Sequence, residues 1–306
     1  MNKKNILITG ASGLIGDRLT DLLHDDGYRI AHLSRTLRSG KARTFLWNID
    51  QDRIDSEAFR SADAIIHLAG ESIGGKRWTK KRKNEILKSR THSTWLLYDE
   101  LKKGNHNVKT FVSASAIGYY GIDDKDAFYH EDDKQGNGFL AEVVHQWEGF
   151  VDQISTLGIR VIKIRNGVVL SEKGGALKEL MKPVKFYIGA QLGKGTQFLS
   201  WIHLDDLCRI FIKAVEDERI QGIYNGVAPN PVTNRDFTHR LANALKRPII
   251  LPPVPPFVLK FVIGEMAGLV LTGVKVSSQK IQTSGFNFKF DNLDDALRDL
   301  LAKEPE

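Results

Sequence analysis

The chain has 306 residues, of which 42% are hydrophobic and 26% charged, a composition that is ordinary for a globular protein and excludes disordered and fibrous classes. Its length suits one large domain, or a nucleotide-binding domain that carries a smaller one. The formal net charge of +7 leaves nucleic acid and phosphate-bearing small molecules as candidate partners.

No apolar run approaches the roughly 20 residues that cross a bilayer, and the longest candidate, 257–271, is interrupted by Lys260 and Glu265. We therefore expect no membrane association. The first residues show no signal-peptide cleavage pattern, and the single cysteine, Cys208, cannot form an internal disulfide, so we expect a cytoplasmic protein. Cys208 lies in an apolar helical pattern, which predicts a position in the core.

Short apolar stretches alternate with segments of helical spacing over the first 170 residues. The predicted strands are 5–9, 29–33, 44–49, 64–68, 110–113 and 160–164. The predicted helices between them include 14–24, 84–102 and 139–157. This alternation predicts an α/β fold, a doubly wound parallel sheet of the Rossmann type, whose ligand crevice lies at the carboxyl ends of the strands.

The regular alternation fades after residue 170, where glycines at 174, 175, 189, 193 and 195 indicate a loop-rich stretch and the prolines of 252–256 stiffen another. We predict a Rossmann domain over residues 1–170 that also receives part of 200–228. The remainder, 171–306, is predicted to be a substrate-side region with a small C-terminal domain at about 250–300.

A glycine-rich turn follows the first strand and opens the first helix. Gly10 permits the tight turn, Gly13 lets the backbone approach a pyrophosphate, and Gly16 lets the helix pack closely on the strand. Free N–H groups at the helix start would hold the phosphates. The predicted cofactor-binding residues of this turn are Gly10, Ser12, Gly13, Leu14, Ile15 and Gly16. The strand before and the helix after favour a dinucleotide site over a plain glycine turn.

The second strand runs into Ser34 and Arg35. Enzymes selective for NAD commonly carry an acidic residue there, which grips the ribose hydroxyls and would repel a 2′-phosphate. A guanidinium instead pairs with phosphate through charge-assisted hydrogen bonds. Ser34 and Arg35 therefore predict NADP(H), and the alternative for Arg35 is a solvated loop position.

Several motifs together resemble the extended short-chain dehydrogenase/reductase family. They are the glycine turn 10–16, HLAG at 67–70 and FVSAS at 111–115. More narrowly, segments 70–78, 200–206 and 224–229 are similar to a branch of NAD(P)-dependent, nucleoside-diphosphate-sugar epimerase-like proteins. The stretch 252–297 is similar to the small domain that ends that branch, so the resemblance covers essentially the whole chain.

The resemblance also implies positions around the cofactor. It assigns Leu68 and Ala69 to the adenosine side and adds Gly70 to the cofactor-binding residues. Arg90 falls where extended members place an asparagine near the cofactor, so it could reach the pyrophosphate with Glu85 as its orienting partner. The alternative for these two is an exposed helix pair. The segment around Arg165 matches the one that passes beside the nicotinamide.

The family's usual acid/base pair is missing. In the wider family a tyrosine, and a lysine four residues later that lowers its pKa, work with a serine at the end of the preceding strand. Ser115 matches the serine. Phe139 and Val143 stand at the tyrosine and lysine positions, and neither can transfer a proton.

Other residues could replace the pair. Tyr119 and Tyr120 follow Ser115 through a turn that would bring them over the nicotinamide, although packing against substrate is the competing role. Glu142 and His145 titrate in a more useful range, but a solvated helix face is their competing role. His203 is a further candidate for contact with ligand.

Three functions compete. The first is an NADP(H)-dependent oxidoreductase or epimerase-like enzyme acting on a small polar carbonyl or hydroxyl compound, nucleotide-linked compounds included. The second is an NADP(H)-binding sensor or scaffold that has lost catalysis, as the missing pair suggests. The third, a nucleic-acid-binding protein, rests on charge alone, and the acidic patch 131–133 favours a solvated helix entrance for the basic cluster 76–83. We rank them in that order, expect no nucleic acid and no metal, and consider a homodimer.

Overall fold

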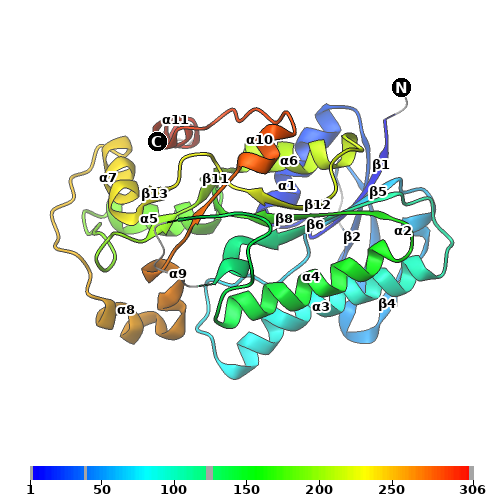
Figure 1. Cartoon of the computed structure of the whole chain (residues 1–306), viewed down its shortest axis with the longest axis horizontal. Helices are drawn as coiled ribbons and strands as arrows, with labels where there is room; N and C mark the ends of the chain where they lie inside the picture. Colours follow the sequence, from blue (N-terminus) through cyan, green and yellow to red (C-terminus); the bar gives the residue numbers. More distant parts are fainter. Residues whose placement is uncertain (1–2, 38–39, 122–126, 303–306) are drawn as a thin grey trace.

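A central sheet of eight strands runs through the molecule (Figure 1). The computed structural model describes residues 3–37, 40–121 and 127–302. The strands of the sheet are β1 (Asn5–Thr9), β2 (Arg29–Ser34), β3 (Arg43–Asn48), β4 (Arg53–Ile54), β5 (Ala64–His67), β6 (Thr110–Ala116), β8 (Arg160–Asn166) and β12 (Gly222–Gly226). Their order across the sheet is β12-β8-β6-β5-β1-β2-β3-β4.

Every neighbouring pair in this sheet is parallel except β3 and β4. From β1 the chain builds outward through β2 and β3 on one side, and then returns to place β5 on the other side of β1. Such a reversal opens a crevice outside the carboxyl ends of the two strands that flank it. The predicted doubly wound α/β fold is confirmed.

Helices cover both faces of the sheet. On one face lie α1 (Leu14–Asp25) and α6 (Leu204–Glu216), and on the other lie α3 (Lys80–Lys102) and α4 (Phe139–Ser155) (Figure 1). Arg18 of α1 forms a two-pronged ion pair with Asp205 of α6 at 2.7 and 2.9 Å. With both faces covered, strands such as β1 are apolar throughout, and Ile6, Leu7 and Ile8 are almost completely buried.

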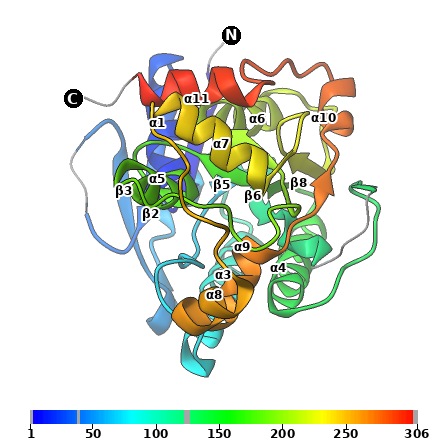
Figure 2. The same cartoon turned by 90° about the vertical axis from the view of Figure 1, so that its left-hand side faces the viewer.

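A second core lies beyond one end of the sheet, in front of the strands in Figure 2, and its helices are α5 (Gly175–Lys185), α7 (Asn234–Ala244) and α11 (Leu293–Leu301). The rest of the chain outside the sheet forms α8 (Pro256–Ile263), α9 (Gly268–Leu271) and α10 (Gln279–Thr283). Its strand pairs are β9 (Val168–Leu170) with β11 (Trp201–His203), β10 (Phe198–Leu199) with β13 (Val232–Thr233), and β7 (Phe128–Tyr129) with β14 (Lys275–Val276). Four short elements complete the described chain, namely α2 (Glu57–Arg60), η1 (Ile49–Gln51), η2 (Ile117–Tyr120) and η3 (Gly264–Ala267).

One stretch predicted to be loop-rich contains a helix. The helix α5 starts at Gly175 and buries Leu177, Met181 and Val184, which follow each other at helical spacing. The glycines around it bound this helix rather than exclude it. Across the described ranges, no helix is both long and apolar enough to cross a membrane.

Candidate functional site

The glycine-rich turn has the geometry that its sequence predicts. Gly10 has a φ of +70°, and a Cβ there would lie 2.7 Å from the carbonyl carbon of Leu68 at the end of β5. The Gly13 N–H donates to the Gly10 carbonyl at 3.0 Å, which closes the turn. A Cβ on Gly16 would lie 2.5 Å from the Gly10 carbonyl oxygen. Side chains at Gly10 or Gly16 would therefore push the turn away from β5 and α1 away from β1.

The first turn of α1 is open to an anion. Gly13 is its N-cap residue and makes no side-chain hydrogen bond, so the N–H groups of the first turn keep no intrahelical or side-chain acceptor. Ser12 and Gly13 are exposed, and Leu14 and Ile15 are half-buried. N–H groups and a helix dipole at such a terminus favour phosphate, and these residues fit the pyrophosphate of a dinucleotide.

A buried hydrogen-bond chain fixes the junction of β1 and β5 below this turn. Thr9 Oγ1 accepts from the N–H groups of Leu68 and Ala69, both at 3.2 Å, so its own proton goes to His67 Nδ1 at 2.7 Å. His67 Nε2 then carries the ring proton and donates to Thr94 Oγ1 at 3.0 Å. Burial lowers the pKa of His67 to about 3, so the ring is neutral at physiological pH.

Arg90 is a cation at the edge of the crevice. A Cβ on Gly70 would lie 3.3 Å from the Arg90 guanidinium carbon, which places this side chain directly against the end of β5. Its Nη1 donates to the Ile86 carbonyl at 3.0 Å, and the guanidinium lies over the Trp147 ring at 5.4 Å. Burial lowers the pKa of Arg90 to about 10. No carboxylate within the described residues forms an ion pair with Arg90, so a phosphate would fit beside it.

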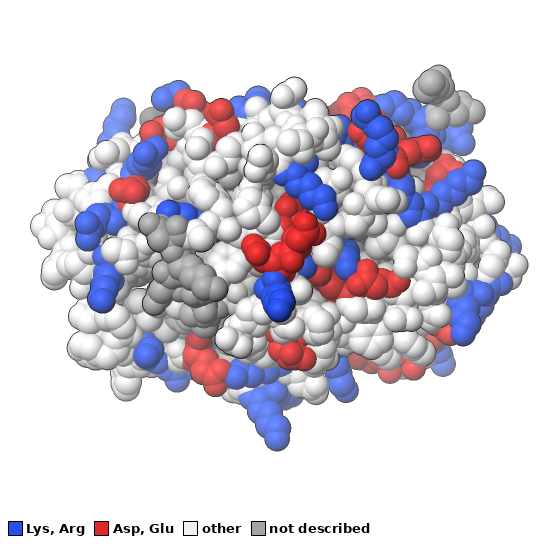
Figure 3. Space-filling model, in the orientation of Figure 1, with Lys and Arg blue, Asp and Glu red and all other residues white. Residues whose placement is uncertain are grey.

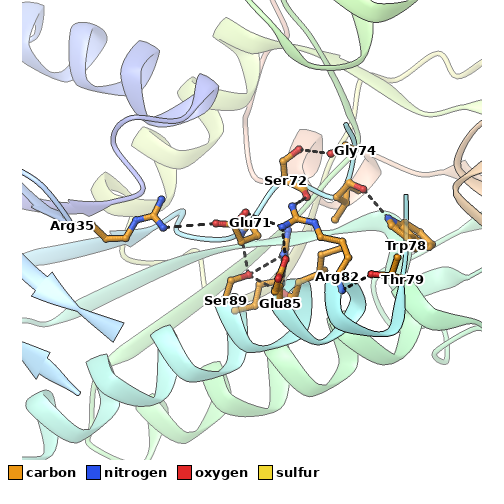
Figure 4. A network of polar contacts seen from close by, with 12 residues as sticks. Arg35, Glu71, Ser72, Gly74, Trp78, Thr79, Arg82, Glu85 and Ser89 are labelled. Carbon is orange, nitrogen blue, oxygen red and sulfur yellow. Dashed lines mark hydrogen bonds and ion pairs between the residues drawn. The ribbon is translucent and has the colours of Figure 1, made fainter. Parts of the chain in front are cut away.

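Glu85 does not orient Arg90. Its carboxylate lies 3.0 Å from Arg82, which also contacts Glu71 at 3.1 Å (Figure 4). Glu71 in turn lies 3.8 Å from Arg35, which reaches across from the end of β2. The Arg35 side chain is 76% exposed, so it is available to a ligand at this edge of the crevice.

The far end of the crevice is built around a buried ion pair. Arg165 on β8 donates from Nε and Nη2 to the two oxygens of Glu148 on α4, each at 2.9 Å. Ser115 at the end of β6 donates its hydroxyl proton to the same carboxylate at 2.5 Å. Burial alone would lower the pKa of Arg165, but the hydrogen bonds and charge of Glu148 outweigh burial and raise it. Arg165 is thus a fixed cation, and its polar atoms point into the protein.

Tyr120 belongs to the same network. Its hydroxyl donates to Asn225 Oδ1 at 2.7 Å and accepts from Arg165 Nη1 at 3.1 Å. Asn225 also receives support from Glu131, whose carboxylate accepts its backbone N–H at 2.9 Å. Burial raises the pKa of Tyr120 to about 12, so this phenol stays protonated at neutral pH.

Tyr119 differs from its neighbour. Its ring lies 3.5 Å from the Arg165 guanidinium carbon, stacked on the planar cation, and its side chain is only half-buried. Its hydroxyl makes no hydrogen bond within the described part of the chain. Of Ser115, Tyr119 and Tyr120, it is the one whose hydroxyl no other described residue bonds.

The positions of the missing pair, and the remaining candidates, have different surroundings. Phe139 packs edge-on against Trp78, and Val143 is 2% exposed. Glu142 and His145 are exposed on α4, as expected for a solvated helix face. His203 is buried, caps α6 by accepting the Asp205 N–H at 3.1 Å and stacks on Phe290, so the structure gives it a local structural role.

The basic cluster 76–83 is only partly a solvated helix entrance. Thr79 caps α3, which begins at Lys80, but Arg82 is 8% exposed. Arg77 donates to the carbonyls of Phe261 and Val262, and Lys83 contacts Glu265. On the face shown in Figure 3, basic side chains are interspersed with acidic ones. No group of three or more potential metal ligands occurs in residues 3–37, 40–121 and 127–302.

Sequence reasoning did not find Glu148. The residue stands on the apolar face of α4, in register with Val144 and Val151, where a lone carboxylate needs a buried partner. That interruption of an apolar stripe is the signal that could have found it. The partner itself, Arg165, was predicted near the nicotinamide, whereas its position in the structure is within this network.

The comparisons with known proteins cover the whole chain. Residues 6–143 match the NAD dependent epimerase/dehydratase family, and residues 254–300 match DUF1731, a domain of unknown function. The chain is 37% identical over 300 residues to the epimerase family protein YfhF of Bacillus subtilis, covering 97% of this chain and 98% of YfhF.

Two solved structures of epimerase-family proteins are also similar to this chain. The human epimerase family protein SDR39U1, crystallised with NADPH, is 31% identical with a TM-score of 0.87, covering 98% of this chain and all of that one. A nucleoside-diphosphate sugar epimerase from Corynebacterium glutamicum is 30% identical with a TM-score of 0.81, covering 99% of this chain and 59% of that one. The resemblance predicted from the motifs is therefore confirmed, and the chain belongs to the NAD-dependent epimerase/dehydratase family, with a DUF1731 domain at residues 254–300.

Proposed function

We propose that the protein is an NADP(H)-dependent epimerase-like enzyme or oxidoreductase that acts on a small polar carbonyl or hydroxyl compound, nucleotide-linked compounds included. The observation that carries this proposal is the uncapped first turn of α1, opposite the exposed Arg35. The NADPH in the human relative and the nucleotide-sugar epimerase from C. glutamicum support the same choice of cofactor and substrate class.

The cofactor would lie along the carboxyl ends of β1, β2 and β5. The turn at 10–16 and the start of α1 would hold the pyrophosphate, with Arg90 as a further cation. Ser34 and Arg35 would bind the 2′-phosphate, and residues 68–70 would line the adenosine. When bound, the nicotinamide supplies the hydride acceptor or donor.

Tyr119 is our candidate for the proton-transfer group. The hydroxyls of Ser115 and Tyr120 are already engaged by Glu148 and Asn225, whereas that of Tyr119 is not. Ser115 and Tyr120 would then position the turn that carries Tyr119. Arg165 would support this turn through the stacked guanidinium and would not contact the cofactor.

The second candidate function is an NADP(H)-binding sensor or scaffold. The observation that favours it is the same network, since the hydroxyls of Ser115 and Tyr120 are both bonded within the protein, to Glu148 and to Asn225 and Arg165 respectively. Nucleic-acid binding has only the net charge in its favour.

Cofactor titration tests the proposal. We expect NADPH to bind the unmodified protein more tightly than NADH, and Arg35→Asp to reverse this order. Arg29→Asp, an exposed change at the opposite end of β2, is the matched control and should leave the order unchanged. Equal affinities for the two cofactors would refute the assignment.

Turnover separates the enzyme from the sensor. With NADPH and a panel of carbonyl compounds, Tyr119→Phe should slow NADPH oxidation at least tenfold, because general acid/base catalysis contributes roughly 100- to 10,000-fold. Its affinity for NADPH should stay nearly unchanged. If unmodified protein and variant oxidise NADPH equally, Tyr119 is not the proton-transfer group; if neither oxidises it with any compound, the sensor is favoured.

A further inference from the structure

Glu71 occupies a fixed position between two parts of the cofactor crevice (Figure 4). It follows β5 by four residues, and its backbone N–H donates to Ser89 Oγ on α3 at 3.0 Å. Ser89 in turn donates to the Ile86 carbonyl at 2.9 Å, so the residue that holds Glu71 is itself tied to the helix. The Glu71 carboxylate therefore faces the start of α3 on one side and the end of β2 on the other.

Each carboxylate oxygen of Glu71 has its own arginine partner. Arg82, with a side chain 10% exposed, faces two carboxylates, Glu71 at 3.1 Å and Glu85 at 3.0 Å, and donates to the Ser72 carbonyl at 2.5 Å. Arg90 is a further cation whose charge acts on Glu71 without an ion pair between the two. The second oxygen of Glu71 lies 3.8 Å from Arg35, so Arg35 is paired with an acidic group of the protein.

We propose that Glu71 determines cofactor specificity by competing with the 2′-phosphate of NADP(H) for Arg35. This inference rests on the proposed function. A phosphate monoester carries about −1.5 to −2 charge at pH 7, and it approaches Arg35 from the exposed side while Glu71 remains on the other. Arg35 then serves two anions, so Glu71 weakens the binding of the phosphorylated cofactor and leaves the unphosphorylated one unaffected.

The competition predicts a gain of affinity from a substitution in the site. Glu71→Gln keeps the size of the side chain and a hydrogen-bond acceptor for Arg82, but removes the charge. We expect NADPH to bind about two- to fivefold more tightly, the range typical of exposed charge pairs, with NADH unchanged. The fragments 2′,5′-ADP and 5′-AMP should show the same difference, because they isolate the 2′-phosphate from the rest of the cofactor.

Matched variants test whether the effect passes through Arg35. Glu57→Gln is the same change at an exposed glutamate of α2, which precedes the opposite, amino end of β5, and it should alter neither affinity. Glu71→Asp keeps the charge and should not produce the gain in NADPH affinity expected of Glu71→Gln. In an Arg35→Gln background, Glu71→Gln should have no effect on either fragment.

The outcomes separate this inference from the proposed function. If the unmodified protein does not prefer NADPH, both are overturned. If it prefers NADPH but Glu71→Gln weakens NADPH binding or leaves it unchanged, only the competition is overturned. A gain that persists without Arg35 would also overturn it, because Glu71 would then repel the phosphate directly.

Discussion

The polar groups at the two ends of the crevice differ in whether they are hydrogen-bonded within the protein. At the end proposed to bind the adenosine and phosphates, here called the adenine end, the start of α1 has no side-chain cap and the guanidinium of Arg35 is exposed. At the end proposed to face the nicotinamide, here called the nicotinamide end, Ser115, Tyr120 and Arg165 are buried and joined in one network with Glu148 and Asn225. The first end is organised to receive an anion, whereas the second is already satisfied.

This difference decides where substitutions should act on stability and where they should act on binding. A buried polar group that is hydrogen-bonded within the protein contributes to the free energy of folding. When its partner is removed, the group stays buried without a hydrogen bond, and the protein is destabilised. A group that waits for a ligand contributes little to folding. Substitutions at the nicotinamide end should therefore lower the stability of the protein, and this loss would mask any effect on turnover. Tyr119 is the exception.

The largest expected effect is that of Glu148→Ala. It leaves Arg165, which is 1% exposed, without its carboxylate, and breaking a buried pair in this way costs about 3–5 kcal/mol. Urea unfolding followed by circular dichroism measures the loss. Glu142→Ala, on the exposed face of the same helix, should cost less than about 0.5 kcal/mol. Equal losses for the two would show that the ion pair does not hold the nicotinamide end together.

His67 should make the junction of β1 and β5 sensitive to acid. Its pKa is about 3 in the folded protein, below the ordinary 6.5, so the unfolded chain binds more protons between these values. The stability contributed by the neutral ring is present above pH 6.5 and falls by about 1.4 kcal/mol for each pH unit below it.

Unfolding in urea at pH 6.5, 5.5 and 4.5 measures this slope. His67→Gln should remove it, because glutamine has no proton to gain in this range. His145→Gln, an exposed histidine on α4, should leave the slope as it is. A slope that survives in His67→Gln would assign the acid sensitivity to other groups.

Much of the fold could be predicted because its signal is local. β1 has the predicted bounds of 5–9, and α1 begins at the predicted residue 14, since an apolar run, a glycine turn and an amphipathic helix each specify themselves. The apolar spacing of α5 is helical, but the glycines that flank it are typical of loops, so the sequence favoured a loop-rich stretch. The pairing of β12 with β8 joins residues about 60 positions apart, and no local pattern specifies it.

The site divides in the same way. The glycine turn is a backbone feature with its own sequence signature, and its geometry follows the prediction. The partners of Ser115 and Tyr120 are Glu148 and Asn225, which lie 33 and 105 positions away, so only the fold reveals that both hydroxyls are engaged. The pairing of Glu85 with Arg82 is local and follows from helix spacing, because these two residues are three positions apart whereas Glu85 and Arg90 are five apart.

Gly16 on α1 tests the close packing at the adenine end, and Gly149 on α4 is its control. A Cβ on Gly16 would meet the Gly10 carbonyl oxygen at 2.5 Å, so Gly16→Ala should cost about 1–3 kcal/mol and weaken NADPH binding as the turn shifts. Gly149 on α4 has nothing within 4 Å of its Cβ position. Gly149→Ala should therefore stabilise the protein by about 0.4–1 kcal/mol. Urea unfolding and cofactor titration of both variants check this, and a stable, tightly binding Gly16→Ala would contradict the close packing of α1.

The smallest expected effect separates two adjacent tyrosines. Tyr120→Phe removes the donor to Asn225 Oδ1 in a fully buried place, which should cost about 1–2 kcal/mol of unfolding free energy. Tyr119→Phe keeps the ring on Arg165 and removes only a hydroxyl that the described residues do not bond, so its cost should stay below about 0.5 kcal/mol. Paired urea titrations measure the difference. If Tyr119→Phe costs as much as Tyr120→Phe, the Tyr119 hydroxyl is engaged in folding, and the proposal that Tyr119 transfers the proton loses its support.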